Sequence, residues 1–74
     1  MNQLKDKYII RHQQWLDKQK LEAPFPLKIR DLMMLWELKS TSPTYHTIKI
    51  LLREGLVKTK KRSSVSTDYY AIEA

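Results

Sequence analysis

The sequence predicts a small α+β domain made of three helices followed by a C-terminal β-hairpin. In three segments, apolar residues recur at helical spacing, and proline or short polar turns separate these segments. The only glycine, Gly55, stands where the third segment has to stop. Beyond it, β-branched and aromatic residues flank a polar loop, the pattern of a hairpin. A chain of 74 residues has room for one modest core, so we expect residues 1–74 to form a single domain.

The first helix is expected over about residues 2–22. Its buried face is expected to carry Leu4, Tyr8, Ile9, Trp15 and Leu16. His12 falls on the same face, where a lone histidine is more often a packing residue than a ligand or a pH switch. A basic amphipathic helix could also lie on a membrane, but Asp6, Asp17 and Glu22 argue against that reading.

Pro24 and Pro26 end the first helix, and residues before proline favour extended backbone. Phe25 is expected to point into the core, and its segment could add a short third strand at the edge of the hairpin. The second helix is expected over about residues 28–38. Its buried stripe consists of Ile29, Leu32, Met33 and Trp36.

The third helix, over about residues 42–54, has clear start and stop signals. Ser40 or Ser42 can accept a hydrogen bond from a first-turn amide, and Pro43 is tolerated in that turn. Gly55 can adopt φ > 0 to end the helix. The apolar stripe is expected to be Ile48, Leu51 and Leu52. The opposite face, which has no carboxylate before Glu54, consists of Ser42, Tyr45, His46, Lys49 and Arg53. That face suits either solvent or the acceptor-rich major groove of DNA.

The last segment, about residues 56–73, is expected to be a hairpin. Its strands are placed at Leu56–Lys61 and Asp68–Ile72, and the loop between them is small and polar. The cations expected near its tip are Lys58, Lys60, Lys61 and Arg62. An isolated hairpin is not stable in water, so it must pack on the helices.

The charge of the chain points to an anionic partner. Fourteen Lys and Arg residues against eight Asp and Glu give a formal net charge of +6. Nucleic acid is the default partner for this excess, and an anionic membrane surface is the competitor. There is no apolar run of bilayer length and no signal-peptide pattern, so we expect a cytoplasmic protein that does not enter a membrane.

Catalytic and cofactor chemistry are not expected. The chain has no cysteine, so His12 and His46 lack the companions of a typical zinc site. Glu37, Glu54 and Asp68 are scattered, without a pairing suited to acid–base work. One glycine cannot form a glycine-rich phosphate loop. We therefore expect no enzyme activity, no cofactor and no metal.

Several short stretches carry a resemblance to a known family: Phe25-Pro-Leu-Lys-Ile-Arg-Asp-Leu32, Leu38-Lys-Ser40, Ser42-Pro-Thr44, Ile48, Leu51 and Glu54-Gly-Leu-Val57. Together they resemble the DNA-binding domain of LexA-type repressors, a winged helix-turn-helix. The ending at Gly55 is also similar to MarR-type regulators. The resemblance implies that Ser40, Ser42, Pro43, Tyr45 and His46 touch the operator. Ser42 and Thr44 could reach phosphate or bases, and Lys49 and Arg53 would meet phosphates. It also implies that the basic hairpin is a wing on the DNA backbone or in the minor groove.

The chain departs from the LexA pattern at two places. Glu37 stands where the turn between helices 2 and 3 often has glycine, so that turn could be longer or helix 2 could run on. Met34 and Leu35 are apolar where the pattern is polar. They are expected either to be buried or to form, with Ile50, an exposed patch for a protein partner.

The function expected from these features is sequence-specific binding of double-stranded DNA, as in a small transcriptional regulator of bacterial or phage type. A domain of this size has little contact area, so a homodimer on a two-fold-related site is expected. Two alternatives remain open. One is a winged-helix module that engages another protein through Met34, Leu35 and Ile50. The other is a non-specific nucleic-acid-binding accessory protein.

Overall fold

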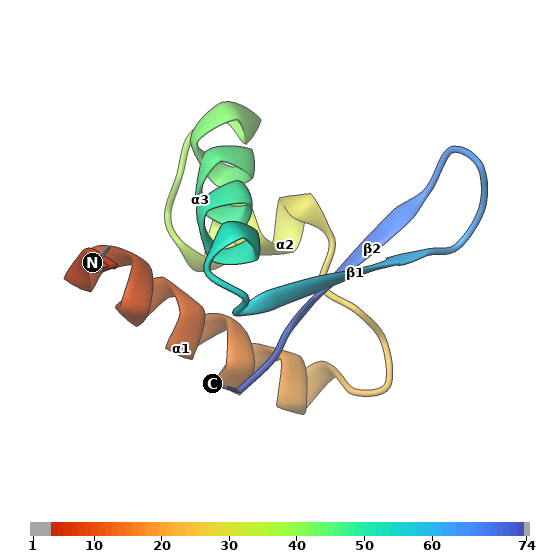
Figure 1. Cartoon of the computed structure of the whole chain (residues 1–74), viewed down its shortest axis with the longest axis horizontal. Helices are drawn as coiled ribbons and strands as arrows, with labels where there is room; N and C mark the ends of the chain where they lie inside the picture. Colours follow the sequence, from red (N-terminus) through yellow and green to blue (C-terminus); the bar gives the residue numbers. More distant parts are fainter. Residues whose placement is uncertain (1–3, 74) are drawn as a thin grey trace.

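The structure, a computed structural model, describes residues 4–73 of the chain. The chain forms three helices and then an antiparallel hairpin, which confirms the expected α+β class (Figure 1). This order is consistent with a winged-helix layout. The elements are α1 (Asp6–Glu22), α2 (Ile29–Leu35), α3 (Thr41–Arg53), β1 (Val57–Lys61) and β2 (Thr67–Ala71).

Helix α1 lies along one side of the molecule (Figure 1), and it contributes Tyr8, Trp15 and Leu16 to the core. Its start differs from the expectation, because residues 4 and 5 precede the helix and residues 2 and 3 lie outside the described range. Tyr8, His12, Trp15 and Leu16 are its buried residues. Ile9 was expected among them but is mostly exposed. At about 100° per residue, it lies off the stripe centred on Trp15.

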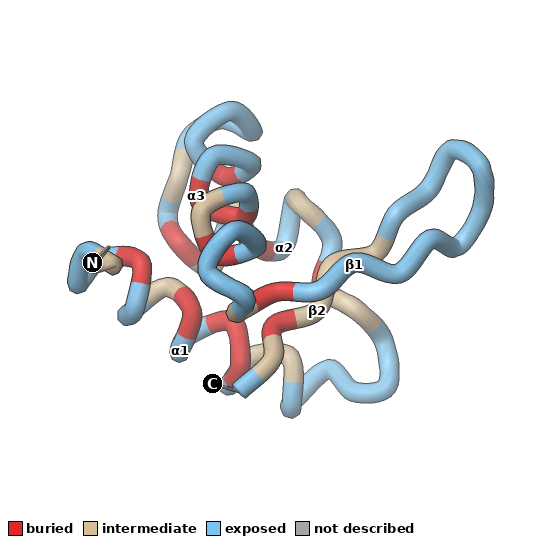
Figure 2. The backbone as a smooth tube through the Cα atoms, in the orientation of Figure 1, coloured by how far each residue is buried: buried red, intermediate tan, exposed pale blue. Residues whose placement is uncertain are grey.

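The core sits where the three helices meet the base of the hairpin (Figure 2). Trp15 and Trp36 pack edge to face, with ring centroids 5.7 Å apart. The expectation that Phe25 enters the core was wrong, because that residue is 73% exposed. Leu27, two residues later, is buried instead. The turn after α1 therefore delivers one aliphatic side chain to the core and leaves the aromatic ring outside.

Helices α2 and α3 end with the same hydrogen-bond pattern. Leu38 N donates to Met33 O at 2.9 Å, and Leu56 N donates to Leu51 O at 2.9 Å. The residues before them have positive φ, 55° at Glu37 and 77° at Gly55. Gly55 thus ends α3 as expected. The expected extension of helix 2 to residue 38 was wrong, because Glu37 adopts the left-handed conformation that glycine usually takes.

The hairpin is anchored at its base and projects from the helices at its tip (Figures 1 and 2). The strands pair from Val57↔Ala71 to Lys61↔Thr67, and Val57 and Ala71 are buried. His12 Nε2 lies 2.8 Å from Ile72 O, so the histidine is a packed, hydrogen-bonded residue. The short third strand expected near Phe25 is not formed, since within residues 4–73 the sheet has two strands. No helix in this range is long and apolar enough to cross a membrane.

Candidate nucleic-acid interface

Helix α3 turns one face fully inward. Thr44, Thr47, Ile48 and Leu51 are its buried residues, at helical spacing. Both threonine hydroxyls donate to a main-chain carbonyl four residues earlier: Thr44 Oγ1 to Ser40 O at 3.1 Å and Thr47 Oγ1 to Pro43 O at 3.0 Å. The expectation that Thr44 contacts DNA was therefore wrong. Its hydroxyl is bound to a carbonyl, and its side chain is 0% exposed.

The outward face of α3 carries the other predicted contact residues. Ser42, Pro43, Tyr45, His46, Lys49 and Arg53 are exposed, and the helix contains no carboxylate. Ser40 is also exposed and occupies the N-cap, but no side-chain capping bond forms there, contrary to expectation. A shallow hollow of about 490 Å³ lies over this face, lined by Ser42, Tyr45, His46 and Lys49. Hydroxyl, phenol, imidazole and ammonium groups thus meet on one surface.

A hydrogen-bond chain from α1 fixes how α3 is rotated. Arg11 Nη1 donates to Thr47 Oγ1 at 2.9 Å, and this hydroxyl donates in turn to Pro43 O. Trp36 Nε1 donates to Arg11 O at 3.1 Å, which ties the loop after α2 to the same point. Because Thr47 lies on the inward face, these bonds hold the Tyr45 and Lys49 side of α3 outward.

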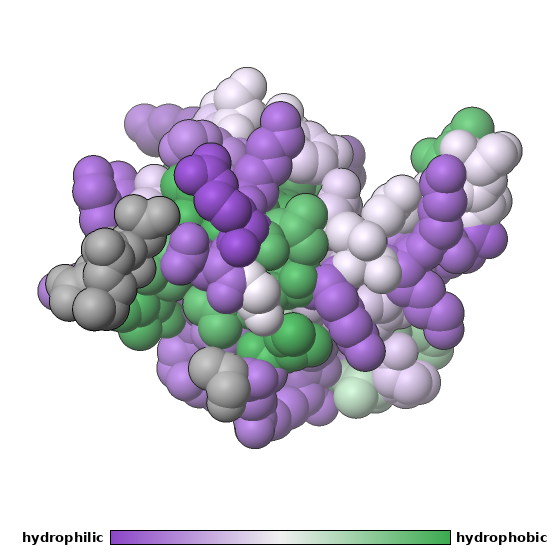
Figure 3. All heavy atoms as spheres, in the orientation of Figure 1, coloured by the Kyte–Doolittle hydropathy of each residue, from purple (hydrophilic) through white to green (hydrophobic). Residues whose placement is uncertain are grey.

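The pairing register divides the lysines of the wing, defined here as residues 57–71, between its two faces. Side chains alternate along a strand, so Lys61 shares the face of Val57 and Thr59. Lys58 and Lys60 occupy the other face, opposite Tyr70 and Asp68. The predicted basic residues of the wing are all exposed, but they do not form one continuous surface. At the tip, Figure 3 shows one hydrophobic side chain among hydrophilic ones, and Val65 in this loop is exposed.

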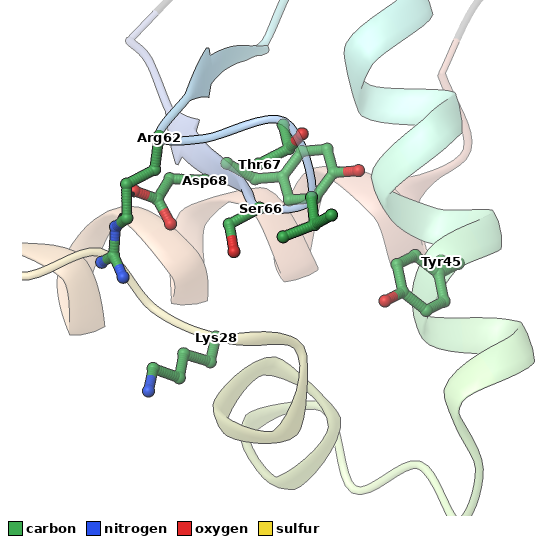
Figure 4. A pocket seen from close by; sticks show the side chains of 8 residues that line it. Lys28, Tyr45, Arg62, Ser66, Thr67 and Asp68 are labelled. Carbon is green, nitrogen blue, oxygen red and sulfur yellow. Dashed lines mark ion pairs between the residues drawn. The ribbon is translucent and has the colours of Figure 1, made fainter.

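A hollow of about 450 Å³, which we call the α3–wing hollow, lies between the outward face of α3 and the wing (Figure 4). Tyr45 borders both this hollow and the one over α3, so the two surfaces adjoin at its ring. The wing lines it with Arg62 and with the residues from Val65 to Tyr69. Lys28, just before α2, lines the same hollow. Lys28 was not predicted as a site residue, because its charge was the only feature in the sequence that distinguished it.

The three apolar residues proposed as a protein interface do not share one environment. Met34 is 71% exposed, whereas Leu35 and Ile50 are partly buried and pack against the core. Leu52 was expected in the buried stripe of α3, but like Met34 it is exposed. It lies on the flank of the helix that carries Tyr45. The structure therefore does not assemble the patch of Met34, Leu35 and Ile50.

The side chains on the outward face of α3 are mainly hydrogen-bonding and cationic groups. Within residues 4–73, no cluster of three or more His, Cys, Asp or Glu side chains is placed to hold a metal ion. Three ion pairs occur in this range, Lys18–Glu22, Lys20–Glu73 and Arg62–Asp68, and none involves a cation of α3. Lys49 and Arg53 are thus free of carboxylate partners in the part of the chain that the structure describes.

Comparison of the chain with protein-family models, curated proteins and solved structures found no match in any of the three.

Proposed function

We propose that this protein binds double-stranded DNA in a sequence-specific manner, as a small cytoplasmic transcriptional regulator. Helix α3 would lie in the major groove, with Tyr45 and His46 toward base edges and Lys49 and Arg53 toward phosphates. The wing would contact the backbone with its exposed cations. The resemblance to winged helix-turn-helix domains of LexA and MarR type agrees with this arrangement.

One observation carries the proposal: the exposed, carboxylate-free face of α3 adjoins the wing at Tyr45. A helix face that is only solvated is not expected to lie next to a second element rich in cations such as the wing. Here the two elements border one common hollow, the α3–wing hollow, and both present hydrogen-bonding or cationic groups to it. The net charge of +6 favours an anionic partner for the same surface.

Homodimerisation belongs to the same proposal. A single domain of this size buries roughly 600–1,000 Å² on DNA, which is little for tight specific binding. Two copies on a two-fold-related site would double this contact. Sedimentation of the free protein and of its DNA complex would give the number of copies in each state.

The proposal is tested by selecting bound fragments from random duplex DNA and then measuring variants on the selected site and on random duplex. Tyr45→Ala or His46→Ala is expected to lose about 1–3 kcal/mol on the selected site and less on random DNA. Lys60→Ala and Lys61→Ala are expected to weaken binding to both DNAs nearly equally, because phosphate contacts carry no sequence information.

The alternatives give different results in this experiment. Recovery of all sequences with equal affinity would favour a non-specific accessory protein, and equal losses for Tyr45→Ala on both DNAs would remove α3 as the reader. If no duplex is retained at low salt, DNA binding is rejected. Stoichiometric capture of one protein would then favour the interaction module.

A further inference from the structure

The α3–wing hollow brings together two cations that are 34 positions apart in the chain (62 − 28). Lys28 stands immediately before α2, and Arg62 follows the last residue of β1. In Figure 4 the two side chains end on the same side of the hollow, and Tyr45 lies on the other. Ser66 and Thr67 add hydroxyl groups to the lining. The lining therefore combines cations and hydroxyl donors around a space of about 450 Å³.

The ammonium group of Lys28 is not engaged by a carboxylate. Asp31, the nearest acid along the chain, accepts the main-chain N–H of Lys28 through Oδ2 at 3.0 Å. No ion pair of Lys28 occurs within residues 4–73. The positive charge is thus available to an external anion. Since the capping bond uses the backbone N–H, the Lys28 side chain can be replaced without losing it.

Arg62 is held only loosely. Its Nε lies 3.4 Å from Asp68 Oδ2, and the side chains are 61% and 20% exposed. Because the guanidinium end of this pair is largely exposed to solvent, another anion can compete with Asp68 for it. With Lys28 and Arg62 positive and Asp68 negative, the lining keeps one uncompensated positive charge.

We infer that the α3–wing hollow is a phosphodiester site, in which Lys28 and Arg62 hold one phosphate of the DNA strand that passes between α3 and the wing. A guanidinium binds phosphate oxygens through paired donors, and an ammonium contributes a point charge. Asp68 competes with the phosphate for Arg62. The inference rests on the proposed function and adds to it a contact residue, Lys28, that belongs neither to α3 nor to the wing.

The test measures binding of a labelled random-sequence duplex across a series of salt concentrations. Each phosphate contact contributes about 0.9 to the slope of log affinity against log salt. Lys28→Gln is expected to lower the magnitude of this slope by about 1. Asp68→Asn is expected to tighten binding at low salt, because it removes the competing carboxylate. Lys20→Gln is the matched control, since Lys20 is exposed, pairs with Glu73 and lines none of the hollows described above.

The outcomes separate this inference from the proposed function. If the unmodified protein binds with a steep salt dependence but Lys28→Gln leaves the slope at the value of Lys20→Gln, the phosphate site is wrong and DNA binding stands. Weaker binding of Asp68→Asn would also overturn the site. If the unmodified protein does not bind duplex, both proposals fall. Thermal unfolding midpoints of the three variants are expected to match that of the unmodified protein.

Discussion

The side-chain amide of Gln19 forms two reciprocal hydrogen bonds with the main chain of Ala71. Ala71 N donates to Gln19 Oε1 at 2.9 Å, and Gln19 Nε2 donates to Ala71 O at 3.0 Å. Ala71 is buried, so these main-chain groups have little access to water. The amide of Gln19 forms the two hydrogen bonds that the backbone of a neighbouring strand could form with Ala71. These bonds fix the base of the wing to α1.

Gln19→Ala is therefore expected to destabilise the protein by about 1–3 kcal/mol, because it leaves a buried donor and a buried acceptor without partners. Urea unfolding followed by circular dichroism would measure the change. Gln14→Ala is the control, since Gln14 is an exposed glutamine on the same helix. Equal effects of the two substitutions would mean that the amide does not anchor the wing.

Glu37→Gly is expected to stabilise the fold by about 0.5–1 kcal/mol. A non-glycine residue at positive φ costs roughly 1–2 kcal/mol, and the extra entropy of glycine in the unfolded chain offsets part of the gain. The observed φ of 55° at Glu37 motivates the change. Thermal unfolding is a sufficient measurement. A lower unfolding temperature would show that the Glu37 side chain contributes more than its backbone strain removes.

Gly55→Ala tests the same geometry with the opposite sign. A Cβ placed on Gly55 would meet no atom within 4 Å, so the penalty comes from the backbone conformation alone. The expected loss is about 1 kcal/mol. Gly55→Asn should lose less, because asparagine tolerates the left-handed region better than alanine. If alanine and asparagine were equally destabilising, a cause other than φ would be required.

Leu51→Ala and Leu52→Ala are expected to differ sharply although the residues are neighbours. Leu51 is 0% exposed in the core, and removing its side chain should cost about 2–5 kcal/mol through lost burial and the cavity left behind. Leu52 is 39% exposed, so its truncation should cost about 1 kcal/mol or less. Denaturant midpoints for the pair measure the difference, and similar losses would place the core boundary of α3 elsewhere.

Arg11→Met is expected to weaken both stability and DNA binding. The substitution keeps most of the aliphatic stem but removes the donor to Thr47 Oγ1, so α3 loses a contact that sets its rotation. Binding to a selected site should fall more than binding to random duplex, because misplacing Tyr45 affects base readout first. An equal fall on both DNAs would point to loss of charge alone.

Local chemistry explains which features of the fold were predictable. The helical periods, the prolines after α1 and the glycine after α3 act through nearby backbone geometry, so they located the three helices and the hairpin. The outward residues of α3 followed from the same period. The boundary at Leu35 was missed because Glu37 is a poor sequence marker for a left-handed residue, and neighbouring bonds hold it there.

The site was less predictable, because burial depends on partners far along the chain. Thr44 and Thr47 were not recognised as core residues, because a polar hydroxyl does not reveal in the sequence that it will bind a main-chain carbonyl four residues earlier. The sequence did not predict that Lys28 lines the same hollow as Tyr45, because that hollow forms only when the wing, α2 and α3 pack together.

The sequence by itself determined the class of the fold, the positive charge and the carboxylate-free face of α3, because composition, helical period and chain-stopping residues are local properties. Only the tertiary structure decided which threonines are buried, that Phe25 lies outside and Leu27 inside, and that Lys28 and Arg62 line one hollow. These features depend on how the elements pack. Packing brings together residues that are far apart in the sequence, and spacing patterns cannot predict such contacts.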